Sequence, residues 1–250
     1  MNLGVVLSLV GVWGCATQEA PRESAAVEVP IEASVEAPAA ADESSGGMRV
    51  TYPNIEIDLE GGRVDVAGRI VLREGLLELV ACVPGTNKDH ESIVSLDARP
   101  QHIHAALLMV GLEPGHPGHW AAEGDQHMRA VDARGDGIRL TVVWREGDQT
   151  IMRPVEEMIL SERTGETMAE GVFVFAGSAI RDLPESMGGG TVYSADMNGT
   201  VVTLVTFPDE MVALPTAASS SNDMVDWRAN GAMIPPLGTR VVLRFEGAGE

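Results

Sequence analysis

Cysteine, aromatic residues and basic residues are all scarce in this sequence of 250 residues. Only two cysteines are present, aromatic residues make up 4%, and 17 Lys and Arg stand against 37 Asp and Glu. No run of cysteines could hold an iron–sulfur cluster, so electron transfer by this chain alone is unsupported. The net charge of −20 opposes electrostatic binding of nucleic acid or anionic lipid headgroups and favours solubility.

The amino-terminal apolar segment is short. The uncharged run Leu3–Trp13 cannot span about 30 Å of hydrocarbon as a helix, but it is typical of a signal-peptide core. Val12-Trp13-Gly14-Cys15 follows directly and resembles the bacterial lipobox, whose cysteine receives the lipid after cleavage. We therefore expect residues 1–14 to be a signal peptide and Cys15 to be lipidated. An ordinary secretory signal or a buried amino-terminal strand are the alternatives.

Residues 15–47 have the composition of a linker. Positions 16–47 contain nine Ala, six Glu, three Pro and no aromatic residue, so they cannot bury enough apolar surface to offset the entropy of ordering. We expect a disordered, lipid-anchored linker that holds the domain away from the membrane. Ala16, not Asp, follows Cys15, so we expect an exported protein anchored in the cell envelope, at the outer membrane or the periplasmic face.

Residues 48–250 are expected to form one globular domain of β-rich α+β fold. Short alternating or β-branched runs predict strands in antiparallel or mixed sheets. Turn residues predict hairpins at Glu146–Gln149 and Asp196–Gly199. One buried helix is expected at about 100–112, packed on a sheet face, and a second short helix at about 154–160. The predicted strands are Arg49–Tyr52, Ile55–Leu59, Arg63–Leu72, Leu76–Val83, Ser92–Asp97, Gly137–Arg145, Thr150–Arg153, Gly171–Ala176, Thr191–Ala195, Thr200–Phe207 and Arg240–Glu246.

All six histidines lie between positions 90 and 127. Imidazole and carboxylate ligands together suit zinc and related ions, so His90, His102 and His104 are candidate ligands of a divalent metal such as zinc. Glu91 is the candidate catalytic base for a metal-bound water. Against this, His102 and His104 would point about 200° apart on a helix, and the alternative is that both bond to neighbouring backbone. The other three are expected to be solvated loop residues: His116, His119 and His127.

Nucleophile signatures are weak. Cys82 follows Leu79, Val80 and Ala81, which favours a buried core thiol over a reactive thiol paired with His90. Ser178 lacks the Gly-x-Ser-x-Gly pattern of a nucleophile elbow.

Several segments together resemble the YdjY-type domain. They begin with Leu79–Pro84, Lys88–Ser92, Ala98–Leu108 and Gly111–Gly115. Phe173–Ser178, Tyr193–Asp196 and Pro235–Thr239 look like the later blocks. The family has no established activity, so the resemblance implies a fold and directs attention to Lys88–Ser92 and Gln101–His104. Asp89 stands where a Glu is expected.

Two functions remain open from the sequence. The first is a membrane-tethered extracytoplasmic module that binds a cell-envelope protein or a small ligand and performs no chemistry. The alternative is a metal-dependent, hydrolytic enzyme that uses His90, Glu91, His102 and His104. Clustered histidines support the second, while the linker, the acidity and the lack of a catalytic signature support the first.

Overall fold

The computed structural model of the chain describes residues 49–123, 127–171, 173–218 and 225–249. The predicted signal peptide, the lipidation site Cys15 and the linker 15–47 lie outside the described residues and stay predictions. Among the helices that the structure describes, none has the length and apolar character needed to cross a membrane.

Eight strands form a closed barrel. Their order around it is β3, β19, β10, β13, β17, β16, β4 and β5, and β5 pairs again with β3. Neighbours are antiparallel except for the parallel pairs β4–β5 and β16–β17. The strands are β3 (Arg63–Ile70), β19 (Arg240–Gly247), β10 (Gly137–Glu146), β13 (Phe173–Phe175), β17 (Val212–Ala213), β16 (Thr200–Thr203), β4 (Leu79–Cys82) and β5 (Ser92–Leu96).

This closure makes the predicted fold class wrong. The sequence predicts an α+β fold in which a helix covers a sheet face, whereas the sheet closes on itself and helices are a minor part of the chain. Alternating residues predict strands but not which distant strands pair. Closure depends on the pairing of β3 with β5 and of β16 with β17, and no local pattern encodes those pairings.

Gly68 permits the barrel to close. It lies opposite Leu96 in the β3–β5 pairing. A Cβ atom at Gly68 would lie 2.6 Å from the Ser95 carbonyl oxygen, far inside ordinary contact. The absence of a side chain therefore allows β5 to approach β3 at the point where the two ends of the sheet meet.

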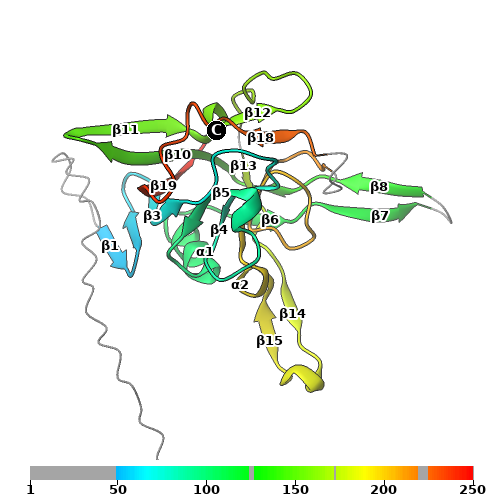
Figure 1. Cartoon of the computed structure of the whole chain (residues 1–250). Coiled ribbons are helices and arrows are strands. Elements are labelled where there is room, and N and C mark those ends of the chain that lie inside the picture. The colour runs from blue at the N-terminus through cyan, green and yellow to red at the C-terminus, as the bar shows by residue number, and fades with distance from the viewer. Residues whose placement is uncertain (1–48, 124–126, 172, 219–224, 250) are drawn as a thin grey trace, which may run out of the picture. The chain divides into compact units, whose positions relative to one another are not determined.

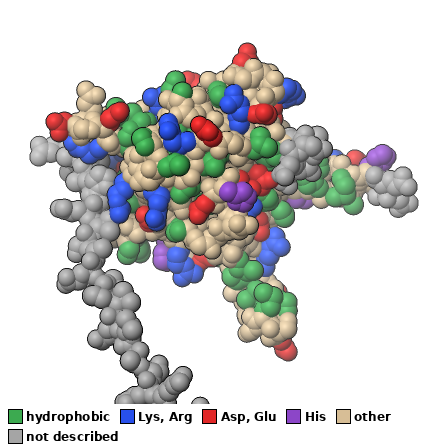
Figure 2. Space-filling view, in the orientation of Figure 1, with side chains coloured by type: hydrophobic (Ala, Val, Ile, Leu, Met, Phe, Trp, Pro, Cys, Tyr) green, Lys and Arg blue, Asp and Glu red, His purple; other side chains and the backbone are tan. Residues whose placement is uncertain are grey.

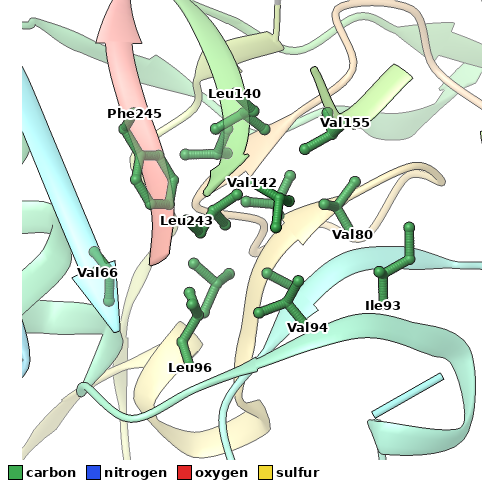
Figure 3. Close-up of a cluster of buried hydrophobic side chains, with 14 of the residues drawn as sticks. Val66, Val80, Ile93, Val94, Leu96, Leu140, Val142, Val155, Leu243 and Phe245 are labelled. Carbon is green, nitrogen blue, oxygen red and sulfur yellow. The ribbon is translucent and has the colours of Figure 1, made fainter. Parts of the chain in front are cut away.

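The hydrophobic core fills the barrel. Val66 of β3 lies opposite Leu243 of β19, which in turn lies opposite Val142 of β10. Residues opposite one another in a ladder share a face, and all three are fully buried. Figure 3 shows these side chains pointing toward one another with Leu96, Phe245 and their neighbours.

The structure describes two α-helices besides the strands. Helix α1 (Pro100–Met109) begins at the predicted proline and buries Ile103, Ala106 and Leu107. Its exposed Leu108 and Met109 differ from the expectation of a helix buried nearly all round. Within the described residues there are also three short 3-10 helices: η1 (Asp89–Glu91), η2 (Val155–Met158) and η3 (Glu185–Met187). The predicted helix at 154–160 is thus η2 followed by strand β12 (Ile159–Ser161).

One of the two predicted hairpins is wrong. β10 and β11 (Gln149–Pro154) form the hairpin expected at Glu146–Gln149. At Asp196–Gly199 the chain instead forms helix α2 (Ser194–Asn198), and Gly199 ends it with a φ of 74°. Asp, Asn and Gly favour helix termini as well as turns, so the same residues were assigned to the wrong structure.

Smaller ladders surround the barrel. β1 (Arg49–Tyr52) and β2 (Ile55–Asp58) extend from β3, and β12 pairs with β18 (Trp227–Ala229). β6 (Pro114–His116) pairs with β9 (Arg134–Gly135). Two hairpins project from the body in Figure 1: β7 (His119–Glu123) with β8 (His127–Val131), and β14 (Ile180–Asp182) with β15 (Thr191–Tyr193).

Candidate functional site

A cavity of about 490 Å³ lies where α1, β6 and the β14–β15 hairpin meet. Its residues come from segments far apart in the sequence, and four of those segments are among the ones that carry the family resemblance. Charged side chains are absent from the described lining. The lining residues are Gln101, His104, Pro114, Gly115, Gly177, Ser178, Ile180, Thr191, Val192 and Tyr193.

His104 and Tyr193 form the polar centre of this His104 cavity. The Tyr193 hydroxyl donates to the Gly177 carbonyl oxygen at 3.1 Å and lies 2.9 Å from Nδ1 of His104. With the phenol proton on the Gly177 oxygen, the tautomer that satisfies both contacts has Nδ1 of His104 donate to the phenol oxygen, which leaves Nε2 as an acceptor. Aromatic edges hold the imidazole, with Phe175 at 4.9 Å and Tyr193 at 5.4 Å between ring centroids.

Burial favours the uncharged form of both rings. It lowers the pKa of His104, and the Gly177 carbonyl acts in the opposite direction. Burial also raises the pKa of Tyr193 well above its usual range; the Asp196 charge adds to this, and a hydrogen bond with Ser178 opposes it. A neutral imidazole beside a neutral phenol offers hydrogen bonds without a charge.

Ser178 lies in a strained backbone conformation, with a φ of 60°. Its Oγ donates to the Asp209 carbonyl oxygen at 2.6 Å and accepts from the Ala195 amide at 3.2 Å. The hydroxyl proton is therefore held by the main chain and not by an imidazole base, which a serine nucleophile would require. Ser178 instead links its own segment to the main chain at Asp209 and at Ala195.

Asp196 positions α1 against α2. Its carboxylate accepts from the Gln101 amide at 2.9 Å and from the Arg99 guanidinium at 2.7 Å. The Gln101 bond satisfies an amide in the first turn of α1, where no residue of the same helix can do so. This contact fixes the helix that presents His104 to the cavity.

The predicted metal ligands have separate partners. Nε2 of the exposed His90 lies 3.7 Å from Glu91, and the Glu91 carboxylate is paired with Lys88 at 2.6 Å. His102 is exposed and its ring stacks near Tyr52, on another side of α1 from the cavity that His104 lines. In the described parts of the chain, no group of three or more His, Cys, Asp or Glu side chains is placed to hold a metal. The zinc site and the role of Glu91 stay predictions.

Cys82 is the buried thiol that the sequence favours. It is fully buried in β4, and Sγ lies 3.3 Å from Oδ1 of Asp89. Burial, with a smaller contribution from Asp89, raises its pKa to about 12, although a contact with Ser92 lowers it. A thiol with this pKa is a poor nucleophile at neutral pH.

The three histidines that were expected in loops are exposed but lie in strands. His116 belongs to β6, His119 to β7 and His127 to β8. The rings of His116 and His119 are 6.3 Å apart.

Glu210 is a buried acid that no sequence pattern indicates. It is 1% exposed, and its carboxylate accepts from the Gly118 amide at 2.8 Å and the Phe207 amide at 2.6 Å. Burial raises its pKa to about 7, although both amides oppose the shift. The group thus ties the turn before β7 to the turn after β16.

A family model for the YdjY domain matches residues 55–246. The chain belongs to the YdjY domain family. The predicted resemblance is thereby confirmed. No curated protein and no solved structure matches the chain.

Sequence reasoning found one residue of the His104 cavity and missed two. His104 was selected as a member of the histidine cluster between positions 90 and 127, while Ser178 was considered only as a weak nucleophile and Tyr193 was not singled out. A signal was present, since the YdjY resemblance is carried by four segments of the lining: Gln101–His104, Gly111–Gly115, Phe173–Ser178 and Tyr193–Asp196. Their convergence on one cavity becomes visible only in the folded chain.

Proposed function

We propose that this YdjY domain is a membrane-tethered, extracytoplasmic binding module that holds an uncharged polar group of its ligand in the His104 cavity without chemical change. The observation that carries the proposal is the convergence of four family segments on this one cavity. About 490 Å³ falls within the usual range of small-ligand sites, roughly 300 to 1,000 Å³.

The cavity lining supports an uncharged ligand. From Met48 onward the chain has 30 acidic and 16 basic residues, yet the described lining contains no charged side chain. A charged ligand would lose hydration on entry without gaining an ion pair. A ligand with a hydrogen-bond donor would meet the acceptor at Nε2 of His104.

The fixed hydrogen bonds support binding over catalysis. Tyr193 donates to Gly177, and Ser178 donates to Asp209, so neither proton is available to a substrate. Such a preorganised wall reduces the entropy lost when a ligand binds.

Ligand binding should depend on His104 and not on His102. We expect N-acetyl-leucinamide or methyl glucoside, added at millimolar concentration to the full-length Cys15→Ser protein, to shift amide resonances around the cavity in NMR spectra. His104→Ala should weaken binding of the responding probe about tenfold, because one hydrogen bond and its packing are lost.

His102→Ala is the matched control, since His102 lies two residues away on α1 and faces Tyr52. It should bind like the Cys15→Ser parent. Equal affinity in the His104→Ala and His102→Ala proteins, or no shift with either probe, would contradict binding in the cavity.

The tether is proposed from the sequence alone, from the lipobox at Cys15 and the linker 15–47. Cells that produce the protein and are labelled with radioactive palmitate should incorporate label into it, and Cys15→Ser should abolish incorporation. Cys82→Ser should leave incorporation unchanged because Cys82 is fully buried. Undiminished label in the Cys15→Ser protein would place the anchor elsewhere.

A further inference from the structure

The β14–β15 hairpin offers an unpaired strand edge beside the His104 cavity. β14 pairs with β15 and with no other described strand. All three of its residues are exposed, and Ile180 retains 77% of its accessible surface. The hairpin projects from the barrel in Figure 1, and hydrophobic side chains cover much of it in Figure 2.

The hydrogen-bond phase shows which main-chain groups are free. The Ser194 amide donates to Ala179 and the Leu183 amide donates to Gly190, both at 2.8 Å, so Ala179, Arg181 and Leu183 bond toward β15. Because an antiparallel strand directs alternate residues to opposite edges, the N–H and C=O groups of Ile180 and Asp182 point away from β15. Within the described residues, no other segment bonds to them.

The same hairpin face lines the cavity. Ile180 lies opposite Tyr193, and Asp182 lies opposite Thr191. Residues opposite one another or two apart share a face. Ile180, Thr191 and Tyr193 of this face line the cavity, and so does Val192, which lies on the other face of β15. A strand added beside β14 would therefore direct every second side chain to the cavity side.

We propose that the ligand of the His104 cavity is an extended peptide that adds to β14 through the main chain of Ile180 and Asp182 and places one uncharged side chain in the cavity. This inference rests on the proposed function. Main-chain bonds would supply affinity, and the cavity would select the side chain.

Charge favours a basic flank in that peptide. The exposed carboxylate of Asp182 has no ion-pair or hydrogen-bond partner among the described residues, and the chain carries a net charge of −20. A Lys or Arg opposite Asp182 in the added strand would make a cross-strand pair of opposite charge. The peptide therefore has an uncharged residue for the cavity and a basic residue near it.

A random heptapeptide library displayed on phage, selected on the full-length Cys15→Ser protein, tests the inference. Enriched sequences should contain an apolar or uncharged polar residue near a Lys or Arg. The synthetic peptide made from the enriched sequence should bind about tenfold more weakly to Ile180→Pro, which lacks the outward amide donor. N-methylation of one alternate set of peptide amides should weaken binding to the same degree, and this change cannot disturb the fold of the protein.

Thr150→Pro is the matched control. Thr150 is exposed on β11, whose pairing with β10 directs the Thr150 amide outward, so the same substitution changes another free edge. The Thr150→Pro protein should bind the peptide as tightly as the Cys15→Ser parent. No enrichment, or peptide affinity that is insensitive to both Ile180→Pro and N-methylation, would overturn the inference. Binding of N-acetyl-leucinamide or methyl glucoside, and its loss in His104→Ala, test the proposed function separately, because these small probes do not need the β14 edge.

Discussion

Gly68→Ala should destabilise the protein by about 2 to 4 kcal/mol, because the new methyl group overlaps backbone that cannot move independently. The added Cβ would lie 2.6 Å from the Ser95 carbonyl oxygen and 3.2 Å from Cα of Leu96. Relief requires β3 and β5 to separate at the closure of the barrel, which weakens their ladder. Urea denaturation followed by circular dichroism would measure the loss.

Gly171→Ala is the control for this substitution. A Cβ atom at Gly171 would meet only the Ala169 carbonyl oxygen at 3.7 Å, an ordinary contact, so we expect a change within about 0.5 kcal/mol. If Gly68→Ala and Gly171→Ala have equal stability, β3 and β5 do not approach as closely as described.

The stability of the protein should fall as the pH rises from 5 to 8, through Glu210. Its pKa is about 7 in the folded chain against 4.5 as the ordinary value. The folded state therefore binds this proton more tightly. The resulting stability is fully present below the ordinary pKa of 4.5, falls as the pH rises above it, and is lost once the pH passes the folded pKa of about 7. The contribution of Glu210 over this interval is about 2 to 3 kcal/mol.

Glu210→Gln isolates this contribution because glutamine does not titrate. The variant should be less stable than the wild-type chain at pH 5, since its amide group faces the Gly118 or Phe207 donor. This gap should shrink by about 2 to 3 kcal/mol at pH 8. Glu166→Gln, at an exposed position, should follow the wild-type profile. A gap that does not vary with pH would mean that Glu210 is ionised throughout.

Local structure was predictable wherever one residue pattern has one structural meaning. Alternation of apolar and polar residues predicts strands that include β3 and β10. Gly147-Asp148 predicts the turn between β10 and β11, and Pro100 predicts the start of α1. The prediction was wrong where one pattern has two meanings, as at Asp196–Gly199, which ends a helix. It was also wrong for the fold class, since barrel closure rests on long-range pairings and on the space left by Gly68.

The His104 cavity was predictable only in outline. Histidine clustering directed attention to α1, but the neighbours of His104 are Tyr193 and Gly177, which lie more than seventy residues away in sequence. His102, only two positions distant, faces Tyr52. Closeness in sequence therefore suggested a shared site for His102 and His104, which helix α1 directs to different sides. The actual neighbours of His104 are brought to it by tertiary contacts between segments that are distant in sequence.

The position of β19 in the barrel has a consequence for the order of folding. β19 is the last described strand, yet it lies between β3 and β10 and pairs with both along most of its length. During synthesis, β3 and β10 emerge long before the strand that joins them, so the barrel cannot close until Arg240–Gly247 is available. Such sequence-distant pairing is slow to form and leaves apolar strands uncovered in the meantime. Nascent chains that lack β19 should therefore be the species that chaperones bind.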